Sequence, residues 1–304
     1  MKRLVLVTGS SYCGSTMLAM LLGGHSRIAT IGEMTGLMGR VDVHTYRCSC
    51  GMRLRECDFW RDVRADLKRN GLKLDLQDFG TSYKPVTRNL FYRLQYSNLR
   101  VNWLEDVRDF IYHLIPKCRH HHNEITNRNF AIAESILKVS GKDIFVDTSK
   151  NPNRVKPFSH SLKDKLIVIH LIRDGRDVVM STRKHKENVT IAEAIRIWKK
   201  VNERAARVLN YVPSNRRCVV RYEDLAADPA GTLERLCRLI GVEYEPSCLK
   251  LCPTNQHIMG NTGARLGDKK KVENPMSGGK RILQEEVSIF ERRAGSINRR
   301  YGYD

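Results

Sequence analysis

Short apolar runs of strand length recur along the chain and alternate with stretches of helical pattern. The apolar runs occupy positions 4–7, 144–146, 166–172 and 218–220. We expect one more short strand directly before residues 31–33. Strands that alternate with helices predict an α/β fold in which helices cover both faces of a central parallel sheet.

Start and stop signals locate three of the helices. A helix over residues 17–22 should end at the two glycines that follow it. The sequence T-I-A-E at 190–193 is a capping box, which predicts a long helix to about residue 208. Asp228 followed by a proline begins a third helix, which should end near Gly241.

Two segments differ from this alternating pattern. Residues 60–130 are polar and basic and contain no clear strand, so we predict a mostly helical insertion that lies over the functional site. Within it, the three histidines at 120–122 are expected in a solvated loop. Several glycines interrupt residues 255–281, which predicts a loop-like tail. We expect a single domain over residues 1–304 that contains this insertion.

Composition limits the class of protein. Hydrophobic residues make up 41% of the 304 residues, which is enough for a packed core. The formal net charge of +20 suggests a polyanionic ligand, a nucleic acid or an anionic surface. The apolar runs are far shorter than the roughly 18 residues of a membrane span, and the N-terminal run is too short for a signal peptide. We therefore expect a soluble, cytoplasmic protein whose cysteines are mostly reduced.

Residues 9–16 have the spacing G-x-x-x-x-G-x-[ST] of a phosphate-binding loop between a strand and a helix. Backbone amides and the positive helix N-terminus would face an anion there, together with the hydroxyls of Ser11, Ser15 and Thr16. Ser15 stands where P-loop nucleoside triphosphatases have a lysine, so a nucleoside triphosphate would lose a main electrostatic support. The alternative is a glycine turn that only joins the strand to the helix.

A second charged turn follows the apolar run at 166–172. Arg173 would leave the carboxyl end of this strand, which is the edge at which ligands bind in open α/β sheets. Ser181 lies on the first turns of the next helix, so the two residues could hold a second phosphate. The alternative is a solvated turn with a surface ion pair.

Together, the two segments resemble the two cofactor loops of the sulfotransferases that use 3′-phosphoadenosine 5′-phosphosulfate (PAPS). In that family, the first loop binds the 5′-phosphosulfate, and an Arg and a Ser eight residues apart bind the 3′-phosphate. By this resemblance, Arg173 and Ser181 bind the 3′-phosphate. The resemblance assigns binding of the phosphosulfate to the residues of the first loop: Ser11, Tyr12, Cys13, Gly14, Ser15 and Thr16.

Further blocks extend this resemblance over residues 4–35 and 144–265. They are R-Y-E-D-L at 221–225 with Asp228-Pro229, the pair Trp198 and Asn202, and a C-terminal block of His257, Gly260, Asn261 and Arg265. The C-terminal block is similar to the loop that closes over the cofactor in carbohydrate-type members, which makes Arg265 a candidate for cofactor binding. The resemblance implies the P-loop-NTPase-like sulfotransferase fold.

The resemblance also implies the catalytic residues. Lys150 lies in a D-T-S-K-N-P segment similar to the lysine segment of tyrosylprotein sulfotransferases, so it would contact the sulfonate and replace the cation that many members have where Tyr12 stands. Glu33 would be the base that removes the acceptor proton. His25 is the rival base, because imidazole titrates near neutral pH. Ser15 would stabilise the transferring oxygens. A solvated lysine and a structural glutamate are the alternatives.

Cys48, Cys50 and Cys57 lie close together in the sequence, with His44 nearby. They could hold zinc, form a disulfide or pack as free thiols, but their spacing differs from the usual zinc-binding pairs. We expect packed free thiols and no metal site.

These observations predict an enzyme that moves a sulfonate from PAPS to a hydroxyl of a small metabolite, a sugar or a peptide tyrosine, without a metal. The insertion at 60–130 is expected to select the acceptor. One alternative is a small-molecule kinase with a degenerate phosphate loop. The other is a basic nucleic-acid-binding protein, but the charges are spread along the chain and no nucleic-acid-binding motif is present, so we expect no nucleic-acid partner.

Overall fold

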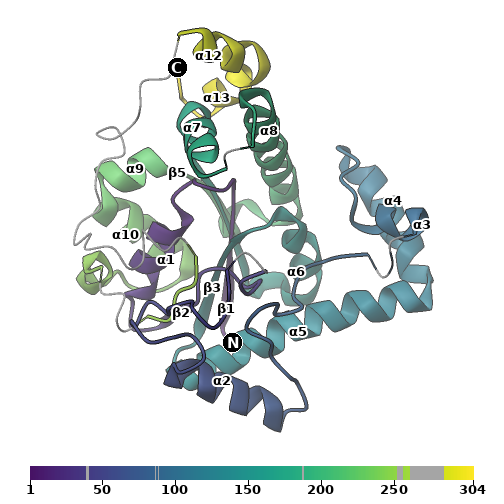
Figure 1. Ribbon diagram of the computed structural model, residues 1–304, viewed down its shortest axis with the longest axis vertical. Helices are drawn as coiled ribbons and strands as arrows, with labels where there is room; N and C mark the ends of the chain where they lie inside the picture. The colour runs from purple at the N-terminus through teal and green to yellow at the C-terminus, as the bar shows by residue number, and fades with distance from the viewer. Residues whose placement is uncertain (39–40, 86, 88, 187, 252–255, 261–283) are drawn as a thin grey trace.

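A computed structural model of the chain contains a central sheet in the strand order β2-β3-β1-β4-β5 (Figure 1). It describes all residues except 39–40, 86, 88, 187, 252–255 and 261–283. All neighbouring strands of the sheet are parallel. The strands are β1 (Arg3–Thr8), β2 (Ile28–Thr30), β3 (Ile144–Lys150), β4 (Leu166–Ile172) and β5 (Arg217–Arg221). The predicted α/β fold is confirmed, and each strand overlaps or directly follows the expected position.

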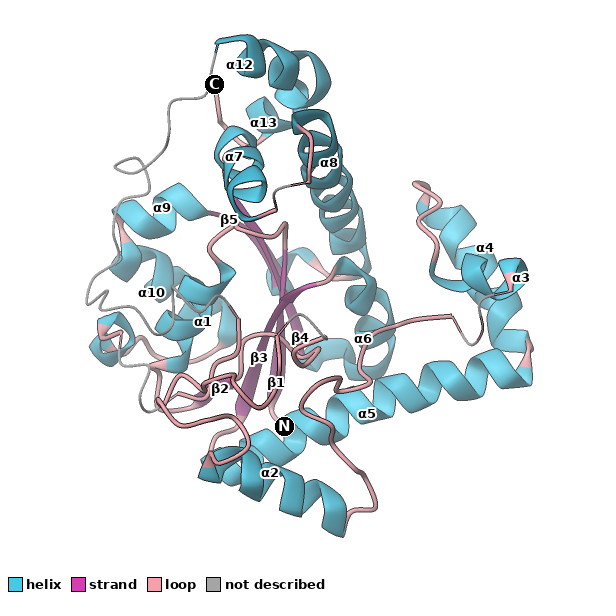
Figure 2. Cartoon of the chain, viewed as in Figure 1, coloured by secondary structure: helices cyan, strands magenta, loops and turns pink. Residues whose placement is uncertain are grey.

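Helices cover both faces of this sheet (Figure 2). The helices of the described chain are α1 (Ser15–Gly23), α2 (Asp58–Arg69), α3 (Leu90–Arg93), α4 (Asn102–Leu114), α5 (Pro116–Ser140), α6 (Val155–Leu162), α7 (Gly175–His185), α8 (Ile191–Val208), α9 (Tyr222–Ala227), α10 (Pro229–Ile240), α12 (Gln284–Phe290) and α13 (Ser296–Arg300). Thr190 caps α8 by accepting a hydrogen bond from the amide of Glu193, as the capping box predicts. Asp228 likewise caps α10, which ends at Gly241.

Successive side chains of the central strand β1 point to opposite faces of the sheet, so the core is divided between the two faces. Leu4 and Leu6 of β1 point to one face, where they pack with side chains of α2, α5 and α6. Val5 and Val7 point to the other face, where they pack with side chains of α1 and α10. Every residue of β4 is buried, as expected for an interior strand covered on both sides. The sheet is therefore a rigid platform for the loops at its carboxyl edge.

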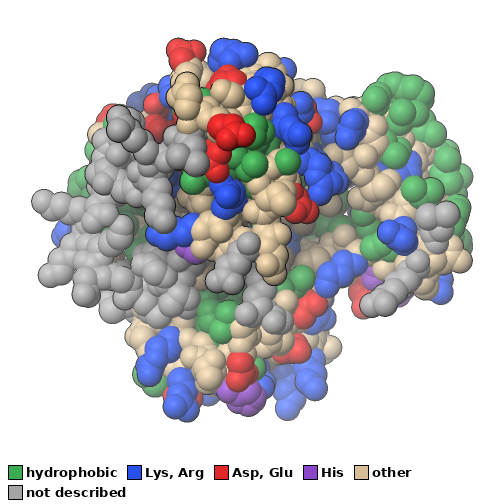
Figure 3. Space-filling model, turned by 45° about the horizontal axis from the view of Figure 1, so that its top comes forward, with side chains coloured by type: hydrophobic (Ala, Val, Ile, Leu, Met, Phe, Trp, Pro, Cys, Tyr) green, Lys and Arg blue, Asp and Glu red, His purple; other side chains and the backbone are tan. Residues whose placement is uncertain are grey.

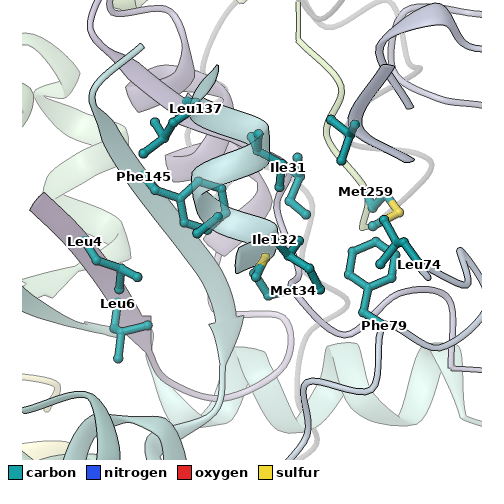
Figure 4. Packing of buried hydrophobic residues seen from close by; sticks show 14 of the residues in the cluster. Leu4, Leu6, Ile31, Met34, Leu74, Phe79, Ile132, Leu137, Phe145 and Met259 are labelled. Carbon is teal, nitrogen blue, oxygen red and sulfur yellow. The ribbon is translucent and has the colours of Figure 1, made fainter. Parts of the chain in front are cut away.

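The predicted insertion contains helices α2 to α5 and is mostly helical. Phe79 of the insertion and Ile132, which follows it on α5, join the same core cluster as Leu6 of the sheet (Figure 4). In contrast, α3 and α4 lie at the far end of α5, away from the sheet (Figure 1). The prediction of a loop at 120–122 is wrong, because these histidines lie within α5. Pro116 occupies the first turn of that helix, a position that favours proline.

Most of the predicted tail lies outside the described residues. The described part, residues 256–260, forms no helix but adds a short bridge beside the end of β2, where Met259 pairs with Gly32. No described helix is long and apolar enough to cross a membrane.

Candidate active site

The phosphate-loop sequence forms a tight turn at the carboxyl edge of the sheet, between β1 and α1. Gly9 passes so close to β4 that a Cβ atom on it would lie 2.3 Å from the carbonyl oxygen of Leu171. Gly14 has a φ of 90°, and a Cβ atom there would lie 2.1 Å from the ring of Tyr222. Both positions therefore require glycine. The first turn of α1 contains no acidic residue, so its positive end favours an anion in this turn.

Tyr12 and Lys150 both have a left-handed backbone conformation, with φ values of 65° and 62°. Such a conformation costs about 1–3 kcal/mol for a residue with a side chain and is found mainly at functional sites. Lys150 pairs with Thr8, the last residue of β1, and Tyr12 follows Thr8 by four positions, so both residues lie at the carboxyl edge of the sheet. The fold therefore maintains two strained residues at the same edge.

Arg173 follows β4 and is held beside the loop by three contacts. Its Nη1 donates to the carbonyl oxygen of Tyr12 at 3.3 Å, and its Nη2 donates to Asp177 at 3.0 Å. Its guanidinium group also lies over the ring of Tyr222, 4.8 Å from the ring centre. The charged group is therefore fixed at the loop instead of extending into solvent.

Helix α7, which begins two residues after Arg173, also contacts the loop. The ring of His185 stacks on the ring of Tyr12, with centroids 5.0 Å apart. Nδ1 of His185 donates to the carbonyl oxygen of Ser181 at 2.8 Å, which places Ser181 one helical turn before the stacked pair. The two segments that the sequence singled out for phosphate binding thus meet at one edge of the sheet.

Cys13 and Ser15 form the buried base of the loop. Cys13 is fully buried and Ser15 is 5% exposed. Burial raises the pKa of the Cys13 thiol, and the positive charges of Lys150 and Arg173 oppose this rise. Both cations are therefore close enough to act on an anion held by the loop.

Lys150 and Glu33 form an ion pair beside this loop. Lys150 Nζ lies 2.5 Å from Glu33 Oε1, and the two side chains are 13% and 24% exposed. Lys150 ends β3, and Glu33 follows β2 after Gly32, whose φ is 77°. A proton acceptor and a cation thus stand next to a candidate anion-binding loop.

A buried network supports the chain segments that carry this ion pair. Arg154 and Asp147 form an ion pair of 2.7 Å, and their side chains are 1% and 2% exposed. Asp147 also accepts hydrogen bonds from the amide and the hydroxyl of Ser149, at 2.8 and 2.5 Å. The Ser149 hydroxyl in turn accepts the amide of Met34 at 2.7 Å. The network therefore joins the end of β3 to the segment after β2.

Residues 256–260 close another side of the site. The amide of Met259 donates to the carbonyl oxygen of Ile31 at 2.6 Å, which adds this segment beside the chain that leads to Glu33. Gly260 comes next, and a Cβ atom on it would lie 3.3 Å from Thr16 Oγ1. The C-terminal segment thus reaches the first turn of α1.

Comparison with known proteins identifies the family. The sequence profile of the sulfotransferase family matches residues 5–246. The chain belongs to the sulfotransferase family. Among solved structures, the sulfotransferase domain from the curacin biosynthetic pathway is similar over 100% of this chain and 99% of its own, with 15% identity and a TM-score of 0.52. Sulfotransferase STF9 from Mycobacterium avium is similar over 100% of this chain and 78% of its own, with 11% identity and a TM-score of 0.52.

These similarities confirm the P-loop-like sulfotransferase fold that the sequence implied. No curated protein sequence matches the chain.

Several residues of this sulfotransferase have roles that sequence analysis missed. Tyr222 contacts both Gly14 and Arg173, so it joins the two predicted cofactor segments. Glu223 accepts the amide of Asp174 at 3.1 Å and thereby holds the turn after Arg173. The block 221–225 was part of the sequence resemblance, but these residues were assigned no contacts there; their position directly after a strand, like that of Arg173, could have indicated them.

His25, the rival base, lies at the opposite edge of the sheet from Glu33. It precedes β2, whereas Glu33 follows it. His25 is 1% exposed, its Nε2 donates to the carbonyl oxygen of Glu243 at 2.8 Å, and its Nδ1 accepts the amide of Arg27 at 3.0 Å. Because backbone groups occupy both ring nitrogens, the histidine joins segments of the fold at that edge.

Cys48, Cys50 and Cys57 form no disulfide, and the described residues contain none. They gather around His257, whereas His44 is not part of the cluster. Sequence analysis missed this partner because it lies 200 positions after Cys57. Two other predicted positions, Asn261 and Arg265, lie outside the described residues.

Proposed function

We propose that this sulfotransferase transfers a sulfonate group from PAPS to a hydroxyl of an acceptor. The proposal rests on the Lys150–Glu33 ion pair beside a phosphate loop in which Ser15 replaces the lysine of P-loop nucleoside triphosphatases. A loop of amides and hydroxyls with one adjacent cation suits a transferred group of low charge. The carboxylate suits removal of the acceptor proton.

The donor would bind along the carboxyl edge of the sheet. The loop amides and the N-terminus of α1 would face its 5′-phosphosulfate. Arg173 and Ser181 would bind its 3′-phosphate, for which Arg173 offers a charged, bidentate donor. The contacts of Arg173 to Tyr12 and Tyr222 support this role, because they orient the side chain before the donor arrives.

In the proposed reaction, Glu33 accepts the proton of the acceptor hydroxyl. The freed oxygen forms a bond to sulfur while the bond from sulfur to the bridging phosphate oxygen breaks. The electron pair of that bond leaves on 3′-phosphoadenosine 5′-phosphate (PAP). Lys150 and Ser15 stabilise the negative charge on the transferring and leaving oxygens. Lys150 supplies the positive charge that Tyr12 lacks.

The acceptor would enter from the side of the insertion. A cavity of about 530 Å³ lies between the insertion and helices α6 and α8. Its lining includes Asn153, which follows Lys150 by three positions, and an aromatic wall of Tyr96, Phe110 and Tyr112. The described residues that line it include none of those assigned to the donor. Such a wall suits an acceptor with an aromatic or apolar part.

Calorimetry with PAP and AMP tests the donor site. We expect PAP to bind far more tightly, because only PAP offers a 3′-phosphate to Arg173 and Ser181. Equal affinities would overturn the assignment of this second segment.

A transfer assay with radiolabelled PAPS and pooled hydroxylated acceptors tests the reaction. The protein is desalted first and assayed with and without added magnesium. We expect labelled product from PAPS in both assays, because no step requires a metal to bridge phosphates. Turnover only with magnesium, and with ATP as donor, would favour a kinase.

A further inference from the structure

Three thiols and one imidazole converge at a point outside the proposed donor site. Sγ of Cys48 and Sγ of Cys57 lie 3.5 and 3.3 Å from Nδ1 of His257. Sγ of Cys50 lies 3.6 Å from Sγ of Cys57. All four atoms lie within 4.8 Å of one another. Each of these atoms is a common ligand of zinc.

These separations match the edges of a zinc tetrahedron. Zinc bonds of about 2.3 Å to sulfur and about 2.0–2.1 Å to nitrogen give tetrahedral edges of roughly 3.8 Å between two sulfurs and roughly 3.6 Å between sulfur and nitrogen. Of the six edges, that between Cys50 Sγ and Cys57 Sγ is 3.6 Å, and those from His257 Nδ1 to Cys48 Sγ and Cys57 Sγ are 3.5 and 3.3 Å. The other three edges are no longer than 4.8 Å. The four side chains are therefore spaced to hold one ion.

The local backbone also fits a zinc site. Cys48 and Cys50 lie on a tight turn, in which the amide of Gly51 donates to the carbonyl oxygen of Cys48 at 2.9 Å. Cys57 directly precedes α2, where the positive end of the helix favours a thiolate. The ring of His257 stacks on Phe59 with centroids 4.2 Å apart, which fixes the direction of its nitrogen.

The other two explanations account for less of this arrangement. A disulfide requires two sulfurs about 2.0 Å apart, and it would use only two of the three cysteines. Packing of free thiols does not require an imidazole nitrogen directed at two of the sulfurs. A tetrahedral ion uses all four groups at once.

We propose that Cys48, Cys50, Cys57 and His257 bind one zinc ion in a closed, structural site. Thiolate ligands with one imidazole in tetrahedral geometry favour zinc over the other common divalent metals. Four protein ligands leave no open position for water or a substrate. The ion therefore takes no part in sulfonate transfer, and the site is independent of the reaction proposed above.

The zinc site would position the closing segment 256–260. Ser49, which lies between two of the cysteines, forms hydrogen bonds with the residues on either side of His257. Its hydroxyl accepts the amide of Ile258 at 2.9 Å and donates to the carbonyl oxygen of Gln256. Because the same segment continues to the first turn of α1, zinc would hold the closing segment against the donor site from a distance.

The zinc content of the full chain tests the site directly. The protein is produced without a histidine tag and purified without chelator, and its zinc is measured by inductively coupled plasma mass spectrometry. We expect about one zinc ion per chain, as for a structural site with four ligands. Cys50→Ser and His257→Ala should lose this zinc. Cys218→Ser, a thiol of β5, and the double variant His120→Ala/His121→Ala should retain it.

The wild-type protein decides the question if these variants fail to fold. Exchange of the bound ion for cobalt should give the ligand-field bands of a tetrahedral site and a thiolate charge-transfer band. Wild-type protein that contains no zinc after growth with zinc, and that gives no such bands with cobalt, would overturn the proposal. Detection of a disulfide among the three cysteines by mass spectrometry would also overturn it.

A binding measurement tests the positioning role separately. Removal of zinc with a chelator, followed by desalting, should weaken PAP binding by about 5–150-fold, the usual range for coupled sites. Added zinc should restore it. Unchanged affinity in folded, zinc-free protein would remove the positioning role but leave the metal site intact. Failure of the zinc-loaded protein to bind PAP would count against the proposed reaction alone.

Discussion

The proposed donor edge, the carboxyl edge of the sheet with Lys150 and Arg173, differs from helix α4 in how its side chains are held. At the donor edge, Lys150 and Arg173 are mostly buried and each pairs with a carboxylate. On α4, Trp103 and Phe110 are both 64% exposed. Figure 3 shows hydrophobic side chains gathered at the edge of the molecule that α3 and α4 occupy. The donor edge is thus organised within the described chain, whereas α4 presents uncovered apolar surface.

This difference follows from what each region would recognise. Phosphates are bound by backbone amides, hydroxyls and arginine at defined places, so the residue types and their spacing indicate the ligand. An apolar surface can be matched by many combinations of side chains, so its residues do not specify what they contact. Substitutions in these two regions should therefore have very different effects.

The largest effect is expected at Glu33. Glu33→Gln keeps the size of the side chain but removes the proton acceptor, so kcat should fall by about 10²–10⁴-fold. PAP affinity should stay nearly unchanged. Steady-state rates and calorimetry measure the two quantities, and Glu56→Gln, at an exposed position before α2, is the matched control. A kcat near the wild-type value, with chemistry shown to be rate-limiting, would make Glu33 a structural residue.

The buried pair beneath the site should control stability. Asp147→Asn should destabilise the fold by about 3–5 kcal/mol, because it leaves Arg154 charged and buried without its partner. Glu234→Gln breaks an exposed pair with Arg238 on α10 and should cost only about 0.3–0.5 kcal/mol. Urea denaturation measures both values. Equal values would show that the Asp147–Arg154 pair is solvated.

Lys150 should affect the rate more than donor binding. Lys150→Ala removes a cation that acts on charge formed in the transition state, so kcat should fall by about 10²–10³-fold. PAPS affinity should decrease only modestly. Tyr12→Lys should partly restore the rate of the Lys150→Ala variant, because it returns a cation to the loop. No rescue, with PAP binding intact, would contradict the idea that Lys150 replaces the loop cation.

The donor edge could be predicted from sequence because its signals are local. Apolar runs and glycine spacing predicted the strands and the loop, and the place of Arg173 after a strand made it a candidate. The partners of Cys57 and Asp147 could not be predicted, because the fold brings His257 and Arg154 to them. The helix that contains residues 120–122 was missed because its polar sequence shows no apolar period.

Substitution of Arg173 should mainly weaken binding of the 3′-phosphate. Arg173→Ala should lose about 1.5–3 kcal/mol of PAP binding, the usual value for hydrogen bonds to charged groups. AMP binding should change much less, because AMP has no 3′-phosphate. Arg176→Ala is the matched control, since Arg176 pairs with Asp174 at 2.6 Å and is not assigned to the donor. Equal losses for PAP and AMP would show that Arg173 contacts a part of the nucleotide other than the 3′-phosphate, or that it supports the structure of the loop.

The smallest effect is expected at Trp103. Trp103→Ala removes a side chain that is 64% exposed, so stability should change by no more than about 0.5 kcal/mol. Trp198→Ala, at a residue 1% exposed on α8, should cost about 3–5 kcal/mol. Urea denaturation at two protein concentrations measures both variants. A large loss of stability in Trp103→Ala, together with a wild-type stability that increases with protein concentration, would show that a second copy of the chain covers α4 in solution. The contrast between the donor edge and α4 would then be a property of the single chain only.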